Sequence, residues 1–338
     1  MKKKALIFGI SGQDGSFLTS LLIKKKYIIF GTTRSKKKYF KNFQKLNINK
    51  NDVKIFQVNH YQKKKIELII RKTKCNEIYF FSGISSVSKS FELEDKTIES
   101  NVTGLINIIQ AVEKVDKNIK IFNPISTDCF GSQKKPINEK SKFNPSSPYA
   151  LSKAMNFYIG ENYKNNLNMW ISSSFLSNHN SLLRNDQFIF GKITKYIKNI
   201  KKNKTNKLLV GNIDIERDWG WAPEFANFMH LIMRSKKPEN YVIGTGKTTS
   251  LRLIIDKLFR KYNYDYRKYI KKDKKLIRPL ESMKNSIDPS LLKKRFKKTP
   301  NVSINQIINN LVQKSGQVQI FFKILHCVNY LYFFKYKL

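Results

Sequence analysis

Tyr149 and Lys153 have the residue types and the spacing best suited to chemistry in this chain of 338 residues. They stand four positions apart, so on a helix their side chains would share one face. A lysine ammonium beside a phenol favours the phenolate and would lower the tyrosine pKa from its usual value of about 10. The pair therefore predicts a base that takes a proton from a hydroxyl group near neutral pH.

This spacing alone also arises by chance in a chain rich in lysine and tyrosine. Two further features give it weight. A glycine-rich turn stands near the start of the chain, and a hydroxyl and a carboxylate, Ser126 and Asp128, stand shortly before the pair. We therefore interpret residues 126–153 as the catalytic segment.

The glycine-rich turn has the pattern G-x-x-G-x-x-G over residues 9–15. It follows a short apolar run, residues 5–8, and precedes a helical pattern of apolar residues between 17 and 22. Glycines in this context let the backbone approach a pyrophosphate, which lies at the helix N-terminus. The residues expected to contact the cofactor here are Gly9, Ser11, Gly12, Gln13, Asp14 and Gly15.

Arg34 and Ser82 extend the expected cofactor site, and Ser85 is an expected substrate-binding residue beside it. Arg34 follows the second expected strand, where an acidic residue would bind a ribose 2′-hydroxyl, whereas an arginine suits a 2′-phosphate. Arg34 therefore favours NADP over NAD, the alternative being an ordinary surface arginine. Ser82 and Ser85 follow the fourth expected strand, and small residues at such strand ends line the cofactor crevice of open α/β sheets.

The elements that must position these residues alternate between strands and helices. This alternation predicts an α/β fold, a Rossmann-type doubly wound parallel sheet with a smaller C-terminal substrate-binding lobe. We expect an NADP-binding domain at 1–175, a sugar-nucleotide lobe interleaved with it at 176–316, and an atypical tail at 317–338. The expected strands are 5–8, 27–30, 53–58, 76–81, 120–123 and 168–175, with helices at 102–115 and from the catalytic tyrosine to about 163.

The formal charge is +41, from 65 basic and 24 acidic residues. Such a charge is typical of nucleic-acid binders, but here the lysines are spread along the whole chain. We interpret the charge as compositional drift that gives a nonspecific affinity for polyanions, with no specific nucleic-acid partner.

The positions of the cysteines and histidines indicate the redox compartment and whether a metal site is expected. The three cysteines, Cys75, Cys129 and Cys327, lie far apart, which suits a reducing, cytoplasmic compartment rather than a disulfide framework. The histidines form no metal-ligand spacing with them, so we expect no metal site. The aromatic tail is interrupted by Lys323 and His326 well short of the roughly 20 residues needed to span a membrane.

With these residues in view, the chain resembles the extended short-chain dehydrogenase/reductases. Within them, it is similar to the GDP-mannose 4,6-dehydratase family over about residues 4–314. The Asn178-His179 and Arg217-Asp218-Trp219-Gly220 segments are specific to that family, and the others are shared more widely. The segments that carry the resemblance are 9–16, 147–150, 175–179, 211–220, 245–247 and Arg278-Pro279.

The resemblance implies a hydro-lyase that uses bound NADP and converts GDP-α-D-mannose to GDP-4-dehydro-6-deoxy-α-D-mannose, a deoxysugar nucleotide. By this resemblance, Ser126 hydrogen-bonds the sugar O4 and Tyr149, assisted by Lys153, takes the O4 proton while hydride leaves C4. Asp128 then removes the C5 proton, water leaves from C6, and hydride returns there.

The resemblance also implies the binding residues and the assembly. It places Asn178 and His179 near the substrate diphosphate, with His179, Tyr149 and Lys153 also on the cofactor side. It further implies a homodimer or a homotetramer. The remaining substrate-binding positions are Lys192, Gly211, Arg217 and Arg278, with Glu281 near the sugar nucleotide.

One departure from the family keeps other interpretations open. The family has glutamate where this chain has Asp128, one methylene shorter, and a misplacement of about 1 Å can cost on the order of 10²-fold in rate. A sugar-nucleotide 4-ketoreductase or epimerase would need Tyr149 and Lys153 but not Asp128. A non-catalytic NADP-binding protein with a basic surface would need none of the three.

Overall fold

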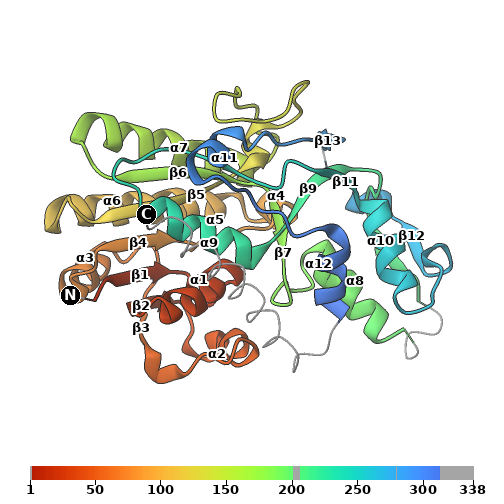
Figure 1. The fold of residues 1–338 in the computed structure, drawn as a ribbon, viewed down its shortest axis with the longest axis horizontal. Coiled ribbons are helices and arrows are strands. Elements are labelled where there is room, and N and C mark those ends of the chain that lie inside the picture. Colours follow the sequence, from red (N-terminus) through yellow and green to blue (C-terminus); the bar gives the residue numbers. More distant parts are fainter. Residues whose placement is uncertain (1, 201–205, 279, 313–338) are drawn as a thin grey trace, which may run out of the picture.

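A seven-stranded sheet forms the centre of the protein (Figure 1). The computed structural model describes residues 2–200, 206–278 and 280–312, so the tail at 317–338 and Pro279 lie outside the described residues. All six strand pairings of this sheet are parallel, as expected. From edge to edge the strands are β10 (Val242–Ile243), β6 (Ile171–Leu176), β5 (Lys120–Ser126), β4 (Glu77–Phe80), β1 (Lys4–Phe8), β2 (Ile28–Thr33) and β3 (Val53–Gln57).

Short apolar runs in the sequence form the buried central strands of the sheet. Ala5, Leu6 and Ile7 in β1 are fully buried because helices cover both faces. The first six strands have the order 3-2-1-4-5-6, which is the doubly wound order that reverses beside β1. The predicted fold class is therefore confirmed.

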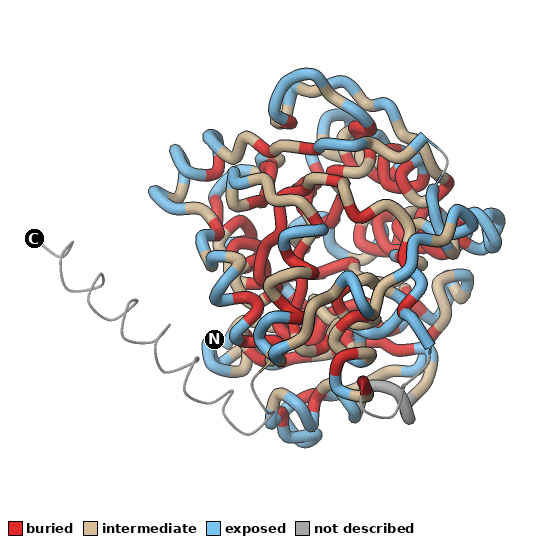
Figure 2. The backbone as a smooth tube through the Cα atoms, turned by 90° about the vertical axis from the view of Figure 1, so that its right-hand side faces the viewer, coloured by how far each residue is buried: buried red, intermediate tan, exposed pale blue. Residues whose placement is uncertain are grey.

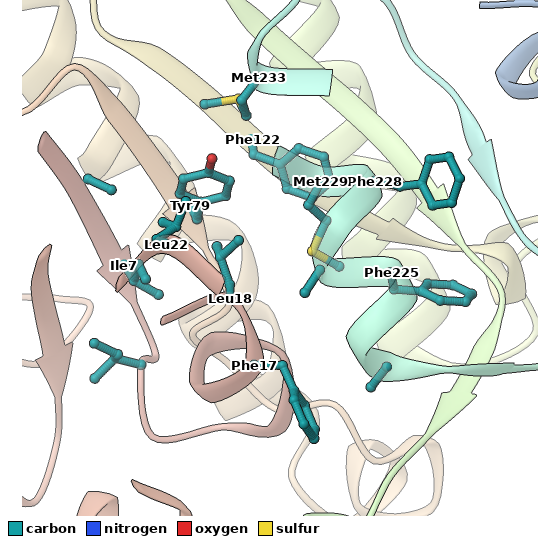
Figure 3. Close-up of a cluster of buried hydrophobic side chains, with 14 of the residues drawn as sticks. Ile7, Phe17, Leu18, Leu22, Tyr79, Phe122, Phe225, Phe228, Met229 and Met233 are labelled. Atoms are coloured by element: carbon teal, nitrogen blue, oxygen red, sulfur yellow. The ribbon is translucent and has the colours of Figure 1, made fainter. Parts of the chain in front are cut away.

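Helices pack on both faces of the sheet. On one face, α1 packs against α9 around a cluster that contains Leu18, Tyr79 and Met229 (Figure 3). On the other face, α3, α6 and α7 bury a second cluster that contains Ile66 and Ile108. The bounds are α1 (Gln13–Lys24), α2 (Lys36–Lys45), α3 (Lys63–Thr73), α4 (Val87–Glu92), α5 (Glu94–Ile98), α6 (Gly104–Val115), α7 (Pro148–Leu167), α9 (Ala222–Met233) and α11 (Ser290–Phe296).

The second half of the chain builds a smaller lobe with its own apolar cluster (Figure 1). It also supplies α9 and β10, which belong to the layers of the large sheet. A division of the chain into domains at residue 175 stays a prediction. The other elements are β7 (Asn178–Asn180), α8 (Ile189–Lys198), β8 (Leu208–Val210), β9 (Glu216–Trp221), β11 (Thr248–Ser250), α10 (Leu251–Arg260), β12 (Ile270–Lys272), β13 (Lys284–Asn285) and α12 (Ile304–Val312).

Burial follows this plan, with the buried residues gathered along the central strands (Figure 2). Within the described ranges, no helix combines the length and the apolar character needed to cross a bilayer.

Several expected boundaries were wrong. Strand β2 continues past Gly31 to Thr33, which pairs with Gln57 of β3. The pairing of β2 with β1 on one side and β3 on the other outweighs the low strand preference of Gly31. Strand β5 continues past Asn123 through Pro124 to Ser126. Beyond residue 122 it pairs only with β6, so the missing N–H of Pro124 is tolerated.

Helix α7 begins at a well-defined position, one residue before Tyr149. The Ser147 hydroxyl accepts a hydrogen bond from the Ala150 amide, and Pro148 occupies the first helical position. The helix ends at Leu167, and the next residue, Asn168, caps it in a left-handed backbone conformation. The start of α7, which positions Tyr149 and Lys153, is therefore encoded locally.

Candidate active site

The predicted site residues follow strands that all end at one edge of the sheet. Gly9 follows β1, Arg34 follows β2, Ser82 follows β4 and Ser126 ends β5. Because the strands are parallel, these side chains and loops meet in one crevice outside their carboxyl ends.

The loop after β1 leaves no room for side chains at two of its glycines. Gly9 has φ +81°, and a Cβ there would lie 2.7 Å from the Phe81 carbonyl group. A Cβ on Gly15 would lie 2.6 Å from the Gly9 oxygen, and α1 begins at Gln13 directly behind this loop. The close-packed backbone and the helix N-terminus fit the diphosphate of a dinucleotide.

The side chains of Gln13 and Asp14 are engaged within the protein. Asp14 Oδ1 lies 3.0 Å from His179 Nε2, and the Ser181 hydroxyl donates to Gln13 Oε1 at 2.7 Å. Direct contact of these two side chains with a cofactor stays a prediction, and so does the cofactor role of His179.

Arg34 is exposed at the end of β2, and its charge acts on His60 beside it. Burial and then the Arg34 charge lower the pKa of His60, against the opposite effect of Glu99. At the end of β4, Ser82 is half-buried and Ser85 is exposed. Arg34 and Ser82 therefore lie at the carboxyl ends of β2 and β4, the two strands that flank β1.

Ser126, Asp128 and Tyr149 come together at the end of β5. The Ser126 hydroxyl accepts a hydrogen bond from the Asp128 amide at 3.2 Å and is also hydrogen-bonded to the Tyr149 side chain. Asp128 belongs to a short 3-10 turn, Thr127–Phe130, that directly follows strand β5. The grouping of these residues predicted from their sequence positions is thus present in space.

The expected lowering of the Tyr149 pKa is wrong for these surroundings. Burial raises the pKa of Tyr149 above its usual value, and the Asp128 carboxylate raises it further, while the hydrogen bond of Ser126 opposes them. The effect of burial could not be read from the four-residue spacing, because it depends on what packs over the phenol.

Lys153 is buried, with 8% of its surface exposed, and its ammonium donates to the Pro124 carbonyl oxygen at 2.9 Å. Burial lowers the pKa of Lys153 to about 8. The ammonium therefore ties α7 to the end of β5, the strand that carries Ser126.

A pocket extends from Asp128 to the small lobe. Arg217 is only 7% exposed, and its guanidinium donates to the Ser282 oxygen at 2.6 Å and the Glu216 oxygen at 2.8 Å. Arg278 lies 4.0 Å from Glu281, whose pKa is raised by burial against the charges of Arg278 and Arg217. The lining residues are Val87, Phe91, Asp128, Gly131, Ser146, Ser147, Arg217, Arg278, Glu281, Ser282 and Asn285.

Four predicted substrate residues are not part of this lining. Asn178 pairs with Trp219 in the sheet of the small lobe, and Ser85 is exposed two positions before the lining residue Val87. The Lys192 ammonium donates to the Leu209 oxygen at 2.7 Å, and a Cβ on Gly211 would lie 2.4 Å from the Leu276 oxygen. Their contact with a substrate stays a prediction.

The sequence reasoning missed Arg184. Its guanidinium lies over the Phe188 ring at 3.6 Å, and its charge acts on both Asp14 and Tyr149. Its Nε is buried without a hydrogen-bond partner. Arg184 stands five residues after His179 in an irregular segment, so no periodicity or spacing signals it.

Fold and site together define a class. A doubly wound sheet with a dinucleotide cradle, and a Ser-Tyr-Lys group beside a pocket with two arginines, is the arrangement of an extended short-chain dehydrogenase/reductase acting on a nucleotide sugar. Solved structures share this fold. A dTDP-glucose 4,6-dehydratase of Bacillus anthracis, in complex with NAD, has a TM-score of 0.79 at 18% identity and covers 96% of this chain and 99% of its own.

A UDP-glucose 4-epimerase of Bifidobacterium longum has a TM-score of 0.80 at 17% identity, over 94% of this chain and 98% of its own.

Comparison of the sequence with known families identifies one particular family. The profile of the family described as GDP-mannose 4,6 dehydratase matches residues 6–311. The GDP-mannose 4,6 dehydratase 1 of Arabidopsis thaliana is 30% identical over 98% of this chain and 94% of its own length. The Dictyostelium discoideum GDP-mannose 4,6 dehydratase is also 30% identical, over 93% of this chain and 96% of its own.

The chain belongs to the GDP-mannose 4,6-dehydratase family, and it is therefore an enzyme of the hydro-lyase class. The family predicted from the motifs is confirmed.

Proposed function

We propose that this chain converts GDP-α-D-mannose to GDP-4-dehydro-6-deoxy-α-D-mannose and water. The observation that carries the proposal is the position of Asp128. Its charge acts on Tyr149 on one side and on Arg217 on the other, so one carboxylate links the predicted base to the pocket.

Ser126 and Tyr149 act on the sugar O4. The Ser126 hydroxyl hydrogen-bonds the sugar O4 beside the phenol, and the Tyr149 oxygen, as phenolate, accepts the O4 proton. Lys153 holds α7 against β5 through the Pro124 carbonyl, so the phenol stays aligned with Ser126. Removal of this proton, together with the departure of hydride from C4 that a bound nicotinamide dinucleotide would accept, would leave a ketone at C4, which acidifies the neighbouring C5–H.

Asp128 serves the elimination. Its carboxylate accepts the C5 proton, the C5–H electron pair forms the C5–C6 double bond, and the C6 hydroxyl leaves as water with the proton that Asp128 has taken up. Asp128 lies on the short 3-10 turn Thr127–Phe130, and its side chain is one methylene shorter than the glutamate that the resemblance implies at this position.

We propose NADP as the cofactor, held by the glycine cradle of residues 9–15, with Arg34 at the adenosine end and the Tyr149 side of the crevice at the nicotinamide end. When bound, a nicotinamide dinucleotide supplies the acceptor and donor for the hydride that moves from C4 to C6. Arg217 and Arg278 bind the diphosphate of the substrate, because a guanidinium fork matches phosphate oxygens. Glu281 accepts hydrogen bonds from the sugar or nucleotide hydroxyls.

An assay with GDP-mannose tests the proposal. The purified chain with NADP should form a 4-keto product with no net change in NADPH, whereas a 4-ketoreductase would consume NADPH. Asp128→Asn should still oxidise C4 but should incorporate no solvent deuterium at C5, with overall turnover lower by about 10²–10⁴-fold. Full turnover of Asp128→Asn would show that the carboxylate is assigned wrongly, and an absence of any GDP-sugar product would favour a non-catalytic NADP-binding protein.

The matched variant is Asp128→Glu, which restores the family's side chain. A rate gain of about tenfold or more would show that the shorter side chain limits elimination. An unchanged rate would show that the backbone of the turn already compensates.

We also propose a cytoplasmic homodimer that contacts through the outer face of α7. Leu151, Met155 and Tyr158 are exposed at spacings of four and three, so they form one apolar stripe opposite Tyr149 and Lys153. Phe91 and Leu93 are exposed nearby on the adjoining segment, which packs on α7. The buried, unpaired Cys75 and Cys129 support a reducing compartment.

A further inference from the structure

The strongest unassigned feature is strand β13, which lies between the strand of Arg217 and the loop that follows β5. On one side β13 pairs with β9, where Asn285 is the register partner of Arg217. On the other side, the Ile137 amide donates to the Ser286 oxygen at 2.9 Å, and the Asp288 amide donates to the Ile137 oxygen at 2.8 Å. Strand β13 and the residues after it therefore connect the small lobe to the catalytic loop.

The side chain of Asn285 reaches the catalytic turn itself. Its amide group lies 3.0 Å from the Gly131 oxygen, 2.8 Å from the Lys284 oxygen and 2.7 Å from the Ser282 hydroxyl. The hydroxyl already donates to the Lys284 oxygen at 3.2 Å, so all three oxygens present lone pairs. An amide oxygen here would face only acceptors, so the amide nitrogen occupies this position and donates to Gly131.

Gly131 ends the turn that carries Asp128. Its φ is +57°, and a Cβ there would overlap the Asn144 oxygen, so glycine is required. The Gly131 amide donates to the Asp128 oxygen at 3.2 Å, and the Asn144 amide donates to the Cys129 oxygen at 2.9 Å. A shift of the Gly131 carbonyl group is therefore passed to Asp128 through one short turn.

Burial gives the contact between Asn285 and Gly131 its strength. Both residues are buried, with Asn285 only 5% exposed, so water does not replace the amide if it is removed. The Arg217 guanidinium, in contrast, is held by the backbone oxygens of Glu216 and Ser282. The Asn285 amide therefore acts on the side of the catalytic turn rather than on the arginine.

We propose that Asn285 is a positioning residue that locks the catalytic turn onto the strand of Arg217, and so sets the reach from the bound diphosphate to the Asp128 carboxylate. The reach matters because a misplacement of about 1 Å can lower a rate on the order of 10²-fold. Asn285 also lines the pocket, and measurements on the ligand-free protein separate positioning from a direct contact with the substrate. The kinetic part of this inference rests on the proposed function, whereas the lock on the turn does not.

Hydrogen exchange of the ligand-free full chain, followed by mass spectrometry, tests the lock. Asn285→Leu removes the amide at nearly the same size, and the amides of residues 127–131 should then exchange about tenfold faster, the effect of one lost hydrogen bond. Asn285→Asp is the second variant. Its carboxylate faces the Gly131 oxygen, so it should accelerate the same amides, and it decides the test if Asn285→Leu does not fold. Wild-type exchange of residues 127–131 in the folded variant overturns the lock.

The matched control is Asn107→Leu on α6, a helix that carries none of the site residues. Asn107 is 7% exposed, and its amide donates to the His60 backbone oxygen at 2.8 Å, so the change removes a similar buried hydrogen bond. It should leave the exchange of residues 127–131 at the wild-type rate. Equal acceleration in Asn107→Leu and Asn285→Leu would reflect a general loss of stability and overturns the lock.

Two measurements with ligands test the positioning of Asp128. The dissociation constant for GDP, measured by calorimetry, should change by less than about twofold in Asn285→Leu, because Arg217 keeps its own backbone partners. Solvent deuterium incorporation at C5 of GDP-mannose, relative to C4 oxidation in a single turnover with NADP, should fall about tenfold.

The outcomes distinguish the possible roles of Asn285. A wild-type ratio of C5 incorporation to C4 oxidation overturns the positioning of Asp128. Weaker GDP binding with unchanged exchange of residues 127–131 also overturns it, because that pattern indicates a direct contact with the substrate. A wild-type protein that turns over no GDP-mannose contradicts the proposed reaction, but the exchange of residues 127–131 still tests the lock.

Discussion

At the scale of single residues, the active site depends on how burial and charge act on Tyr149. The phenol is placed beside Ser126 as its sequence position suggests, but burial and Asp128 raise its pKa. At neutral pH Tyr149 therefore holds its proton, and the reactive phenolate is a minor form. Lys153, with a pKa of about 8, is close to losing its charge under the same conditions.

This predicts a pH profile with a defined sign. Deprotonation of Tyr149 makes the base, and below its pKa each pH unit raises the phenolate fraction tenfold, so kcat/KM for GDP-mannose should rise between pH 6 and pH 8 by up to about tenfold per unit. Above about pH 8 the rise should slow as Lys153 loses its proton. The measurement is kcat/KM against pH at saturating NADP.

Tyr149→Phe is the control for this profile. It should lower turnover by about 10²–10⁴-fold across the whole range while it still binds the dinucleotide. A wild-type profile that falls from pH 6 to pH 8 would contradict the role of Tyr149 as a base.

At the scale of elements, the glycine loop between β1 and α1 is a backbone structure rather than a set of side chains. Gly9 needs a positive φ, and it also lies against the backbone of Phe81 at the end of β4. The loop and the neighbouring strand end are therefore packed as one unit, which leaves the α1 N-terminus open toward the crevice.

Gly9→Ala should therefore affect both stability and dinucleotide binding. Its unfavourable φ costs about 1–2 kcal/mol of unfolding free energy, and the Cβ at 2.7 Å from Phe81 displaces the loop. Gly246→Ala is the matched control, with φ +75° but with Pro289 side-chain atoms as its nearest contact, at 3.3 Å. Urea unfolding and NADPH titration should show stability losses in both variants and loss of binding only in Gly9→Ala. Unchanged binding in Gly9→Ala would contradict the placement of the diphosphate at this loop.

At the scale of the whole molecule, α7 presents one face to the active site and the other outward. The outward stripe includes Leu151 and Tyr158, which are 47% and 62% exposed. An exposed apolar stripe on a helix that carries the catalytic pair suits an interface with a second copy, because burial of the stripe would also steady that helix.

Leu151→Glu combined with Met155→Glu should convert the protein to a monomer, because two buried carboxylates without partners oppose association. Sedimentation velocity measures this directly. Leu68→Glu on α3 is the control, since Leu68 is 62% exposed but lies on another helix, and it should leave the mass unchanged. A monomeric wild type, or a double variant with the wild-type mass, would contradict the interface.

The sequence by itself determined the local and periodic features of this protein. The apolar runs placed six of the seven strands of the large sheet to within a few residues, the glycine spacing located the expected dinucleotide loop, and the four-residue spacing put Tyr149 and Lys153 on one face of α7. These features can be predicted from the sequence because each depends only on residues within one helical turn or one strand.

The tertiary structure alone decided the rest. It joined Asp128 to Arg217 and Glu281, paired Asp14 with His179, brought the charge of Arg184 near Tyr149, and reversed the expected direction of the Tyr149 pKa shift. Each of these depends on which distant segments pack together and on how much water they exclude. The spacing of residues along the chain encodes neither the packing of distant segments nor the exclusion of water. The strength of a charge interaction or a hydrogen bond depends on burial, and only the folded layers create that burial.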